Sequence, residues 1–496
     1  MNKSNSVQDI LVIGGGINGA GIAADAASRG LSVVLCEKGD LASATSSNSS
    51  KLIHGGLRYL EFYEFGLVRK SLKEREILAS IAPHIVRPLA FQIPQLSHSR
   101  RSWLLKAGLF LYDNLAKRDR FKNSSTVRYS SGSLLNDSIK HGFEYWDAQV
   151  DDARLVILNA LQARSHGASI YTRVECVALN PVEQGWSATF QNHLTNESST
   201  QVFRAVVNAT GPWVSSLLEN LTEQGNPHPL RMVKGSHIVV PRIHGGDEAY
   251  LLQHHDGRIV FVIPYLSNYS LIGTTEEEYR GDLDKVEISN DEIDYLISIV
   301  NLYFRKAVHR SDIIHTYSGV RPLIDQSGKS ASSVSRDYRL ELETHPFPLL
   351  SVYGGKVTTY RVLAEQAVSS LVRYFPRMPT SNTSKTPLPG GDFGLSENLF
   401  QDLATKYGWL DPDLLNRWLA SYGRLSFDIL GNVRGLGDLG VKFGANLYQL
   451  EVDYLCKEEW ARTAEDILWR RTKLGYVFNE NEKQSLENYI KQSNPH

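Results

Sequence analysis

The sequence predicts an α/β protein built from a Rossmann-like domain, an antiparallel β-sheet domain and a C-terminal helical domain. Three observations support this fold class. Two short apolar strands flank a glycine-rich turn and a helix near the N-terminus. Residues 229–350 alternate short apolar runs with turns, and the last hundred residues carry helical patterns after a Pro- and Gly-rich linker. The first pattern is typical of parallel βαβ units and the second of antiparallel sheets, so we expect both kinds of sheet.

The first element is a βαβ unit over residues 9–38. Residues 9–13 and 31–36 are expected to form buried strands, with a helix over residues 20–29 between them. Gly14, Gly16 and Gly19 give the pattern G-x-G-x-x-G, which supplies a tight turn, room for a pyrophosphate and close helix–strand packing. The helix N-terminus favours a phosphate, and Glu37 follows at the distance of an acid that accepts hydrogen bonds from a ribose. The complete unit predicts dinucleotide binding, which an unrelated glycine-rich turn would not explain.

Composition and charge argue against several classes of function. The 496-residue chain is 42% hydrophobic and 22% charged, as expected for two or three globular domains. A net charge of −1 gives no basis for nucleic-acid binding, so no nucleic acid is expected as a partner. Three scattered cysteines are too few for a disulfide framework or a metal cluster, and no metal site is expected. No signal peptide and no apolar run near the roughly 18 residues of a membrane span are found, so membrane contact should be peripheral.

A Ser-, Thr- and Gly-rich segment follows at residues 39–61 and becomes basic and aromatic at its end. After a nucleotide-binding strand, such a segment can surround a ligand with hydroxyls and backbone amides. GGGINGAG together with SSKLIHGGLRYLE resembles the FAD-dependent glycerol-3-phosphate dehydrogenases, part of the wider D-amino-acid-oxidase-like flavoprotein family. The resemblance covers nearly the whole chain and implies a Rossmann-like FAD-binding domain with FAD as cofactor. The sequence shows no EF-hand loop, which favours the bacterial aerobic type over the mitochondrial enzymes.

The resemblance also implies which residues contact the cofactor. In the N-terminal part these are Gly14, Gly16, Gly19, Glu37, Lys38, Thr45, Ser46, Ser49, His54, Gly55 and Gly56. His54 could equally be a packing or capping residue. A strand at residues 201–208 runs into NATGPW, the family's second flavin motif, which adds Ala209, Thr210, Gly211 and Trp213. By the same resemblance the backbone of Val174 should lie near the adenine.

Between these motifs, residue patterns predict the connecting elements. We expect helices over residues 61–80 and 102–117 and a strand over residues 89–93. The second helix is apolar on most faces and basic at both ends, so it could be buried between domains or lie in a membrane interface. A helical pattern returns at residues 147–167, with Asp151 or Asp152 as N-cap. Strands are expected at residues 168–177 and 185–191.

The second half of the chain begins with strands and ends with helices. RMVKGSHIVVP, GRIVFVIPY, YSLIGTTEEEY and HTYSGVRPLI predict an antiparallel sheet over the flavin ring, with one helix at residues 290–306. A strand at residues 349–353, a glycine turn and a helix at residues 357–374 return the chain to the first domain. This turn adds Gly354, Gly355, Lys356 and Thr358 to the expected cofactor contacts. The C-terminal part, including WARTAEDILWRRTKLGY, resembles the helical cap of the family.

These elements predict a division into six segments. Three form the FAD-binding domain, at residues 1–90, 146–228 and 351–387. Residues 91–145 form a substrate or cap insertion with the possible membrane-interface helix, residues 229–350 a substrate-binding β domain, and residues 388–496 the C-terminal helical domain.

The resemblance implies glycerol 3-phosphate as substrate, a small dianion whose binding needs several converging cations. Arg58, Arg321, Arg336 and Lys356 lie in the family's motifs and are the candidate ligands, although any single Arg is more often a surface charge. His237, in KGSHIVV, matches the active-site histidine of the family and suits a general base near neutral pH. The alternative is a strand histidine that points into solvent. Lys356, assisted by Thr358, suits negative charge on the N1–C2 edge of the flavin.

The sequence therefore predicts oxidation of sn-glycerol 3-phosphate to dihydroxyacetone phosphate, with hydride transfer from C2 to N5 of FAD and electrons passed to a membrane quinone. An oxidase that uses O2 and releases H2O2 is the first alternative. A flavin-binding, membrane-associated subunit without turnover is the second. An amine or amino-acid oxidase is disfavoured by the several basic residues, and a nicotinamide enzyme by NATGPW and YGGKVTTYR. We further expect a homodimer, held peripherally on the anionic cytoplasmic face of a bacterial inner membrane.

Overall fold

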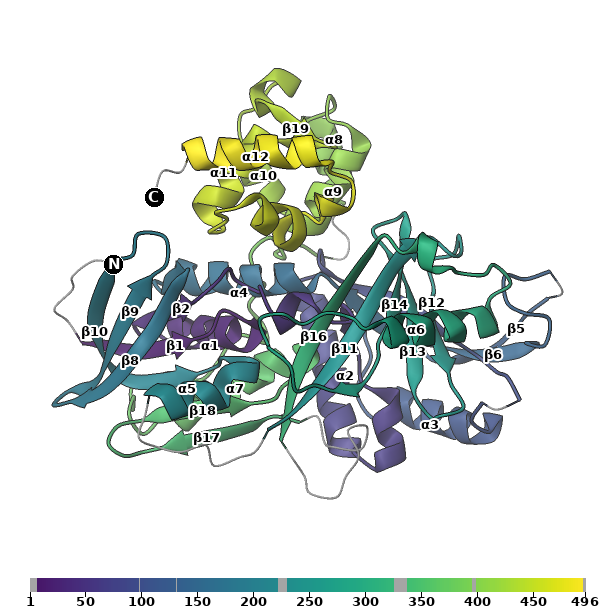
Figure 1. Cartoon of the computed structure of the whole chain (residues 1–496), viewed down its shortest axis with the longest axis horizontal. Coiled ribbons are helices and arrows are strands. Elements are labelled where there is room, and N and C mark those ends of the chain that lie inside the picture. Colours follow the sequence, from purple (N-terminus) through teal and green to yellow (C-terminus); the bar gives the residue numbers. More distant parts are fainter. Residues whose placement is uncertain are drawn as a thin grey trace.

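Two β-sheets and a separate helical domain make up the computed structural model, which describes residues 7–97, 99–130, 132–221, 230–324, 337–394 and 398–493 (Figure 1). The helical domain lies at the top of the view, above α4, and is drawn in yellow and light green. Within the described residues, no helix is both long and apolar enough to cross a membrane.

The first sheet is the Rossmann-like part of the molecule. In the described ranges its strands are β1 (Gln8–Ile13), β2 (Val33–Glu37), β7 (Ser169–Thr172), β8 (Val174–Val182), β9 (Gly185–Asn192), β10 (Ser198–Asn208), β17 (Arg339–Glu343) and β18 (Leu349–Tyr353). β1 pairs in parallel with β2 and β10, and the parallel run continues to β7 on one side and β18 on the other. Antiparallel β9 and β17 add to this run. The ends of the parallel strands therefore meet at one edge, where α/β sheets bind their ligands.

The second sheet is formed by strands that alternate, in blocks along the chain, with the strands of the first sheet. Its described strands are β3 (Leu52–Ile53), β4 (Val86–Pro94), β5 (Ser125–Arg128), β6 (His141–Val150), β11 (Leu230–Pro241), β12 (Ala249–Gln253), β13 (Ile259–Tyr265), β14 (Tyr269–Gly273), β15 (Glu277–Glu278) and β16 (His315–Ile324). Side chains alternate between two cores: Ile238 and Val240 of β11 face one, and Val239 faces the other. Such alternation is what a two-sided sheet requires. β11 is flanked by β14 and β16, both antiparallel.

Helices cover both sheets and build the C-terminal domain. They are α1 (Ile17–Ser28), α2 (Phe65–Ile81), α3 (Ser102–Asn114), α4 (Asp152–Ser165), α5 (Val214–Leu221), α6 (Asn290–Tyr303), α7 (Tyr360–Ser370), α8 (Leu399–Lys406), α9 (Pro412–Tyr422), α10 (Leu425–Leu430), α11 (Gln449–Glu458) and α12 (Glu480–Ser493). α1 packs against α4 and α7, and their apolar side chains share one core with β1 and β2. The C-terminal helices enclose a core of their own and include a π-helical turn, Asp466–Arg471, and a small strand pair, β19 (Lys442–Gly444) and β20 (Leu447–Tyr448).

The observed elements correct several local expectations, among them the bounds of two helices and the strand expected at residues 168–177, which is divided into β7 and β8. The helical pattern expected from residue 147 is wrong at its start, because β6 continues to Val150 and α4 begins only at Asp152. Asp151 is the N-cap, since its side chain accepts a hydrogen bond from the Arg154 N–H. The helix expected over residues 357–374 is shorter: a 3-10 turn, Val357–Thr359, precedes α7, which ends at Ser370.

Sheet membership also differs from the predicted segments. β17, expected in the substrate domain, pairs with β18 in the first sheet. β3 and the first residues of β4, expected in the FAD-binding domain, belong to the second sheet. The chain therefore crosses between the sheets near residues 50 and 340, and the six-segment division stays a prediction.

Candidate active site

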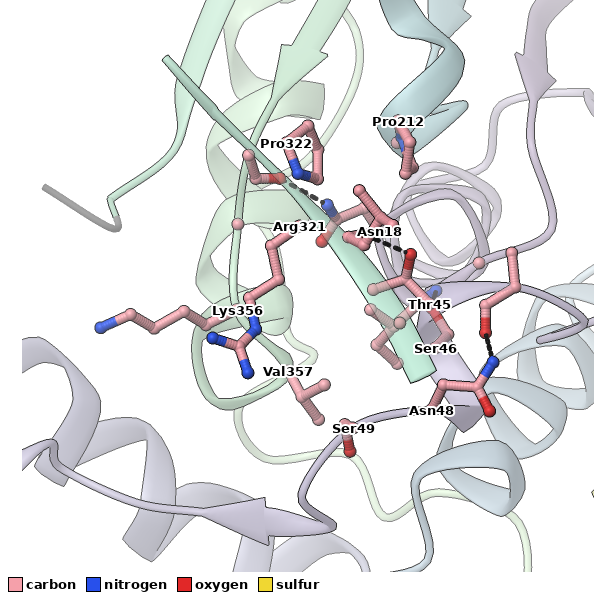
Figure 2. Close-up of a pocket in the computed structure, with 18 of the residues that line it drawn as sticks. Asn18, Thr45, Ser46, Asn48, Ser49, Pro212, Arg321, Pro322, Lys356 and Val357 are labelled. Carbon is pink, nitrogen blue, oxygen red and sulfur yellow. Dashed lines mark hydrogen bonds between the residues drawn. The ribbon is translucent and has the colours of Figure 1, made fainter. Parts of the chain in front are cut away.

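A cavity of about 960 Å³ opens where the parallel strands of the first sheet end and extends under the second sheet. This volume lies at the upper end of the range of roughly 300–1,000 Å³ that is usual for ligand pockets. Residues that directly follow β1, β2, β10 and β18 line it, namely Gly14, Lys38, Ala209 and Gly354. Figure 2 draws part of the lining: in this view Arg321 and Lys356 approach from one side, and Thr45 and Ser46 from the other.

The glycine fingerprint forms the floor at the N-terminus of α1. Gly14 has a φ of 111°, and a side chain there would collide with the Ala209 carbonyl. A Cβ on Gly19 would lie 1.9 Å from the Gly14 oxygen, so this glycine permits close packing and does not itself line the cavity. Gly16 is the N-cap of α1, and its only near neighbour would be the Ser46 hydroxyl at 3.1 Å. This open space at a helix N-terminus suits a pyrophosphate.

Glu37 and Lys38 lie at the end of β2, on the expected ribose side. The Glu37 carboxylate accepts hydrogen bonds from the N–H groups of Gly15, at 2.6 Å, and Gly39, at 2.7 Å. Burial raises the pKa of Glu37, and these two N–H donors lower it in part. Lys38 lies over the Trp213 ring, 4.6 Å from Nζ to the ring centre, and pairs with Asp284 at 3.1 Å.

The Ser- and Thr-rich loop closes one wall of the cavity and is fixed by its own hydroxyls. Ser46 Oγ accepts from the Ile17 N–H at 3.0 Å, and Thr45 Oγ1 donates to the Val320 carbonyl at 2.8 Å. Ser49 Oγ donates to Asp152 at 2.7 Å. The loop is therefore tied to α1, to β16 and to the start of α4.

The Gly354-Gly355 turn lies beside the fingerprint at the cavity. Both glycines have positive φ, 73° and 107°, which side chains rarely adopt. Asn18 of α1 donates to the Gly354 carbonyl at 3.1 Å and so joins the two motifs. Thr358 Oγ1 accepts from the His54 N–H at 3.2 Å, which ties the turn to the loop.

Further cationic side chains line the cavity. Arg58, Arg258, Arg321 and Lys356 all line it. Arg58 pairs with Glu276 at 3.4 Å, and Lys356 Nζ lies 3.8 Å from the centre of the Tyr59 ring. Burial lowers the pKa of Arg321, whose Nη1 has no hydrogen-bond partner among the described residues. A buried guanidinium with an unused donor is a suitable site for an anion.

His237 lies behind the cavity wall rather than in it. Its side chain is 1% exposed and is not part of the lining. The ring stacks on Tyr317 with 4.8 Å between centres, and Nε2 lies 2.9 Å from Ser50 Oγ. Burial, followed by the positive charges of Arg321 and Lys51, lowers the pKa of His237 well below its usual value. The alternative of a solvent-facing strand histidine is therefore wrong.

Most of the predicted site residues face this one cavity. Those that line it are Gly14, Gly16, Glu37, Lys38, Thr45, Ser46, Ser49, His54, Gly56, Arg58, Val174, Ala209, Thr210, Gly211, Trp213, Arg321, Gly354, Gly355, Lys356 and Thr358. Gly55 lies behind the wall, where its N–H donates to Tyr112 Oη at 2.9 Å and a Cβ would meet that oxygen at 2.4 Å. Arg336 lies outside the described residues.

Several lining residues were not predicted from the sequence: Asn18, Ser50, Tyr59, Arg258 and Glu276. Asn18 and Tyr59 stand inside the motifs GGGINGAG and GGLRYLE, so the motifs themselves were a signal for them. Arg258 and Glu276 carry no such signal, because only the folding of β13 and β14 brings them to the cavity.

Comparisons with known proteins identify relatives of this chain. Residues 9–355 match the model of the FAD dependent oxidoreductase family, and residues 381–493 match the C-terminal domain of alpha-glycerophosphate oxidase. A glycerol-3-phosphate dehydrogenase of Pseudomonas aeruginosa is 50% identical over 99% of this chain and 96% of its own length. The aerobic glycerol-3-phosphate dehydrogenase of Escherichia coli is 46% identical, with 97% of each chain covered. A D-erythritol 1-phosphate dehydrogenase of Brucella abortus is 45% identical, with 98% of each chain covered.

A solved structure extends the agreement to the fold. The glycerol-3-phosphate dehydrogenase of Bacillus halodurans, complexed with FAD, superposes with a TM-score of 0.75 at 26% identity, over 99% of this chain and 95% of that one. The open space at Gly16, the acid at Glu37 and the two glycine turns fit such a cofactor. The chain therefore belongs to the FAD-dependent oxidoreductases and, within them, to the family of the glycerol-3-phosphate dehydrogenases.

Proposed function

We propose that this protein oxidises sn-glycerol 3-phosphate to dihydroxyacetone phosphate with FAD and passes the electrons to a membrane quinone. The observation that carries the proposal is the meeting of Arg58, Arg321 and Lys356 in the cavity that also holds the nucleotide fingerprint. A phosphate dianion needs several such donors, whereas an amino acid would need one. The relatives at 46–50% identity bear the corresponding names.

In this proposal the chain binds, orients and deprotonates the substrate. Bound FAD supplies a hydride acceptor at its N5 atom. Arg58, Arg321 and the predicted ligand Arg336 bind the phosphate, which holds the C2 hydroxyl deeper in the cavity. His237 takes the proton of that hydroxyl. Lys356, next to the short helix that leads into α7, stabilises negative charge on the pyrimidine edge of the cofactor.

An anaerobic reduction tests the proposal. Glycerol 3-phosphate should bleach the flavin absorbance of the holoenzyme, and unphosphorylated glycerol should not. D-erythritol 1-phosphate is the necessary competitor, because one relative is named for it. Faster reduction by D-erythritol 1-phosphate would show that the larger phosphorylated polyol is the preferred substrate. No reduction by either phosphate would contradict the reaction itself. Reoxidation by a quinone rather than by air would separate the dehydrogenase from the oxidase.

The electron acceptor and the peripheral membrane location are supported by the outer face of α3. This helix buries Leu105, Leu109 and Tyr112 but exposes Trp103 (66%) and Phe110 (70%). Leu104 and Leu111 are exposed on the same side of this helix. Tyr63 is also exposed, directly after a 3-10 turn, Leu57–Phe62, that contacts α3. Arg101, Lys106 and Lys117 are exposed basic residues of this region. An apolar face with basic neighbours suits the interface of an anionic bilayer, where a quinone is found.

Liposome binding tests this surface. Leu104→Glu combined with Phe110→Glu should abolish binding to anionic vesicles and activity with a lipid-soluble quinone, because two charges enter the apolar contact. Folding, FAD content and activity with a soluble dye should persist, since both side chains are already exposed. Leu436→Glu with Val441→Glu, two exposed apolar residues of the C-terminal domain, is the matched control. If the wild-type protein does not bind anionic vesicles at low salt, the proposal is contradicted. The homodimer and the cytoplasmic face of a bacterial inner membrane stay predictions.

A further inference from the structure

His237 is fixed in a position from which it does not face the cavity. On β11 it is paired with Gly273 of β14 on one side and with Tyr317 of β16 on the other. A Cβ on Gly273 would lie 2.1 Å from His237 Cδ2, so the ring fills the space beside this glycine. Its other neighbour is the Tyr317 ring, at an interplanar angle of 21°. The imidazole therefore cannot turn toward a substrate without displacing one of its neighbours.

Ser50 occupies the place between His237 and the cavity. It lines the cavity, and its Oγ lies 2.9 Å from His237 Nε2. The other ring nitrogen, Nδ1, is buried without a hydrogen-bond partner among the described residues. Within the described part of the chain, the hydrogen-bonding contact of the imidazole therefore runs through the Ser50 hydroxyl.

A buried network holds the residues on both sides of Ser50. Asp152 accepts hydrogen bonds from Ser49 Oγ at 2.7 Å and from Lys51 Nζ at 2.9 Å. Tyr317 Oη donates to the Ser49 carbonyl at 2.9 Å, so the residue that stacks on His237 also anchors this loop. Asp152 is 1% exposed and Lys51 4% exposed. Ser50 is thus positioned from both sides, as a proton carrier requires.

We propose that Ser50 is a catalytic residue that carries the proton from the C2 hydroxyl of the substrate to His237. The inference rests on the proposed oxidation of a phosphorylated polyol. As the hydride leaves C2 for the flavin, the O–H bond of the C2 hydroxyl breaks and its electron pair forms the carbonyl. The released proton binds Ser50 Oγ while the original Ser50 proton passes to Nε2. Ser50 is unchanged, His237 gains one proton, and the substrate has lost one hydride and one proton.

The surroundings of His237 explain why this transfer should depend on bound substrate. Burial lowers the pKa of His237, and the positive charges of Arg321 and Lys51 near the imidazole lower it further, so the free enzyme keeps His237 neutral. Asp152 offsets Lys51 directly, whereas Arg321 has no carboxylate partner among the described residues. A phosphate dianion at Arg321 would supply the missing negative charge and make the imidazole a better base in the complex.

Rapid-reaction kinetics of the holoenzyme test the relay. Ser50→Ala should slow anaerobic flavin reduction by glycerol 3-phosphate about 100-fold or more, the usual loss when a positioned proton-transfer group is removed. Affinity for dihydroxyacetone phosphate should stay within about threefold, because the phosphate ligands are untouched. Ser50→Thr keeps a hydroxyl and should restore most of the rate. Ser47→Ala, in the same loop but outside the cavity lining, is the matched control.

Histidine ¹⁵N NMR supplies a readout other than turnover. Ser50→Ala should shift the Nε2 resonance that His237→Gln identifies by its loss, and Ser47→Ala should leave it in place. The double variant Ser50→Ala/His237→Ala should be no slower than His237→Ala alone, because both residues serve one step. Should Ser50→Ala lose FAD, Ser50→Cys fills the same space with a weaker donor.

The outcomes separate the relay from the proposed function. A wild-type flavin that glycerol 3-phosphate and D-erythritol 1-phosphate both leave oxidised overturns the function. A wild type that is reduced, with Ser50→Ala equally fast or with additive losses in the double variant, overturns the relay alone.

Discussion

Arg321 is a single residue whose buried charge favours the binding of an anionic ligand. Its guanidinium is enclosed between β11 and β14, where a Cβ on Gly235 would come within 2.8 Å of Nη2. The one described hydrogen bond, from Nη2 to Thr274 Oγ1, is long at 3.4 Å. A buried cation with so few partners destabilises the unliganded protein and is stabilised by an anion.

This reasoning gives a prediction for Arg321→Met. The variant keeps the length of the side chain and removes its charge, so glycerol 3-phosphate should bind more than about tenfold more weakly, from a loss of roughly 2–5 kcal/mol for a buried charge pair. The unliganded protein should melt at an equal or higher temperature, because an uncompensated charge has gone. Titration calorimetry and thermal unfolding measure the two effects. Arg280→Met, which changes an exposed arginine, is the control. Unchanged affinity would place the phosphate elsewhere.

The limits of sequence reasoning at this scale are clearest at His237 and Ser50. The glycines could be predicted because tight turns and close backbone approach dictate that residue type. Lys356 was expected only from the resemblance to the family and from its place beside the glycine turn. The position of His237 behind the wall could not. Spacing along a strand shows that a residue alternates with its neighbours, but not which side chain from a distant loop stands in front of it. Ser50 was not predicted, because the sequence does not distinguish it from the other serines of the same loop.

At the scale of elements, a helix N-cap was easier to predict than strand partners. Asp151 was one of two predicted N-caps because short-range chemistry defines a helix start. β6 was missed, although it is long, because its sequence HGFEYWDAQV mixes buried aromatics with buried Asp147. Asp147 is tolerated there mainly through Arg75 of α2 and Tyr112 of α3, which donate to it at 2.7 and 2.8 Å, with a longer hydrogen bond from the Gly55 N–H at 3.3 Å. Such pairing is tertiary and leaves no local pattern.

The junction between α2 and β4 contains a histidine that should make stability depend on pH. His84 is 4% exposed, both of its ring nitrogens lack a hydrogen-bond partner in the described ranges, and Gly423 of the C-terminal domain packs on its ring. Burial, with the charges of Arg154 and Arg87, lowers the pKa of His84 to about 3. Its folded pKa is thus below the unfolded value of about 6.5, so the stabilisation is complete above pH 6.5 and is lost as the pH falls toward 3.

We expect His84→Gln to weaken this acid dependence. Between pH 7 and pH 5 the unfolded wild type binds a proton that the folded state excludes, which costs about 2 kcal/mol at this one residue. The melting temperature of the variant should therefore fall less over that interval than that of the wild type. The melting temperature of the control variant His255→Gln, which replaces an exposed histidine, should fall as much as that of the wild type. Equal slopes for all three proteins would show that His84 titrates normally.

At the scale of the whole molecule, the chain passes from one sheet to the other and back. This is why the domain boundaries were hard to predict from the sequence. Composition marks the start of the C-terminal domain, whose separate core confirms that its helices form one unit. No compositional change marks the return of the chain to the first sheet at β17, because an edge strand of either sheet would show the same alternation. Only the pairing of Arg339–Glu343 with Leu349–Tyr353 decides it.

The C-terminal domain is joined to the body by buried ion pairs that reach the candidate cofactor loop. Arg471 donates to both carboxylate oxygens of Asp40 at 2.8 Å, and Arg470 donates to the same group at 2.6 Å. Asp40 is 3% exposed and Arg471 fully buried. Asp40 stands in the loop whose neighbouring residues Gly39, Ala42 and Ser43 line the cavity. Docking of this domain should therefore fix the loop that borders the nucleotide end of the site.

Asp40→Asn should uncouple these two parts. The substitution keeps the shape of the side chain but removes the carboxylate charge that two buried guanidinium groups share. Arg470 keeps Asp466 and Glu465 as partners, whereas Arg471 keeps only the more distant Glu459 among the described carboxylates, at 3.8 Å. Removing one partner of a buried ion pair typically costs about 3–5 kcal/mol. We expect a lower melting temperature and faster release of FAD. The release is measured as the return of flavin fluorescence after dilution. Excess FAD should restore part of the melting temperature, because a ligand that binds only the folded state stabilises it by mass action. Asp428→Asn, an exposed aspartate of α10, should change neither quantity. If Asp40→Asn melts earlier yet holds FAD as tightly as the wild type, the ion pairs dock the domain without fixing the loop.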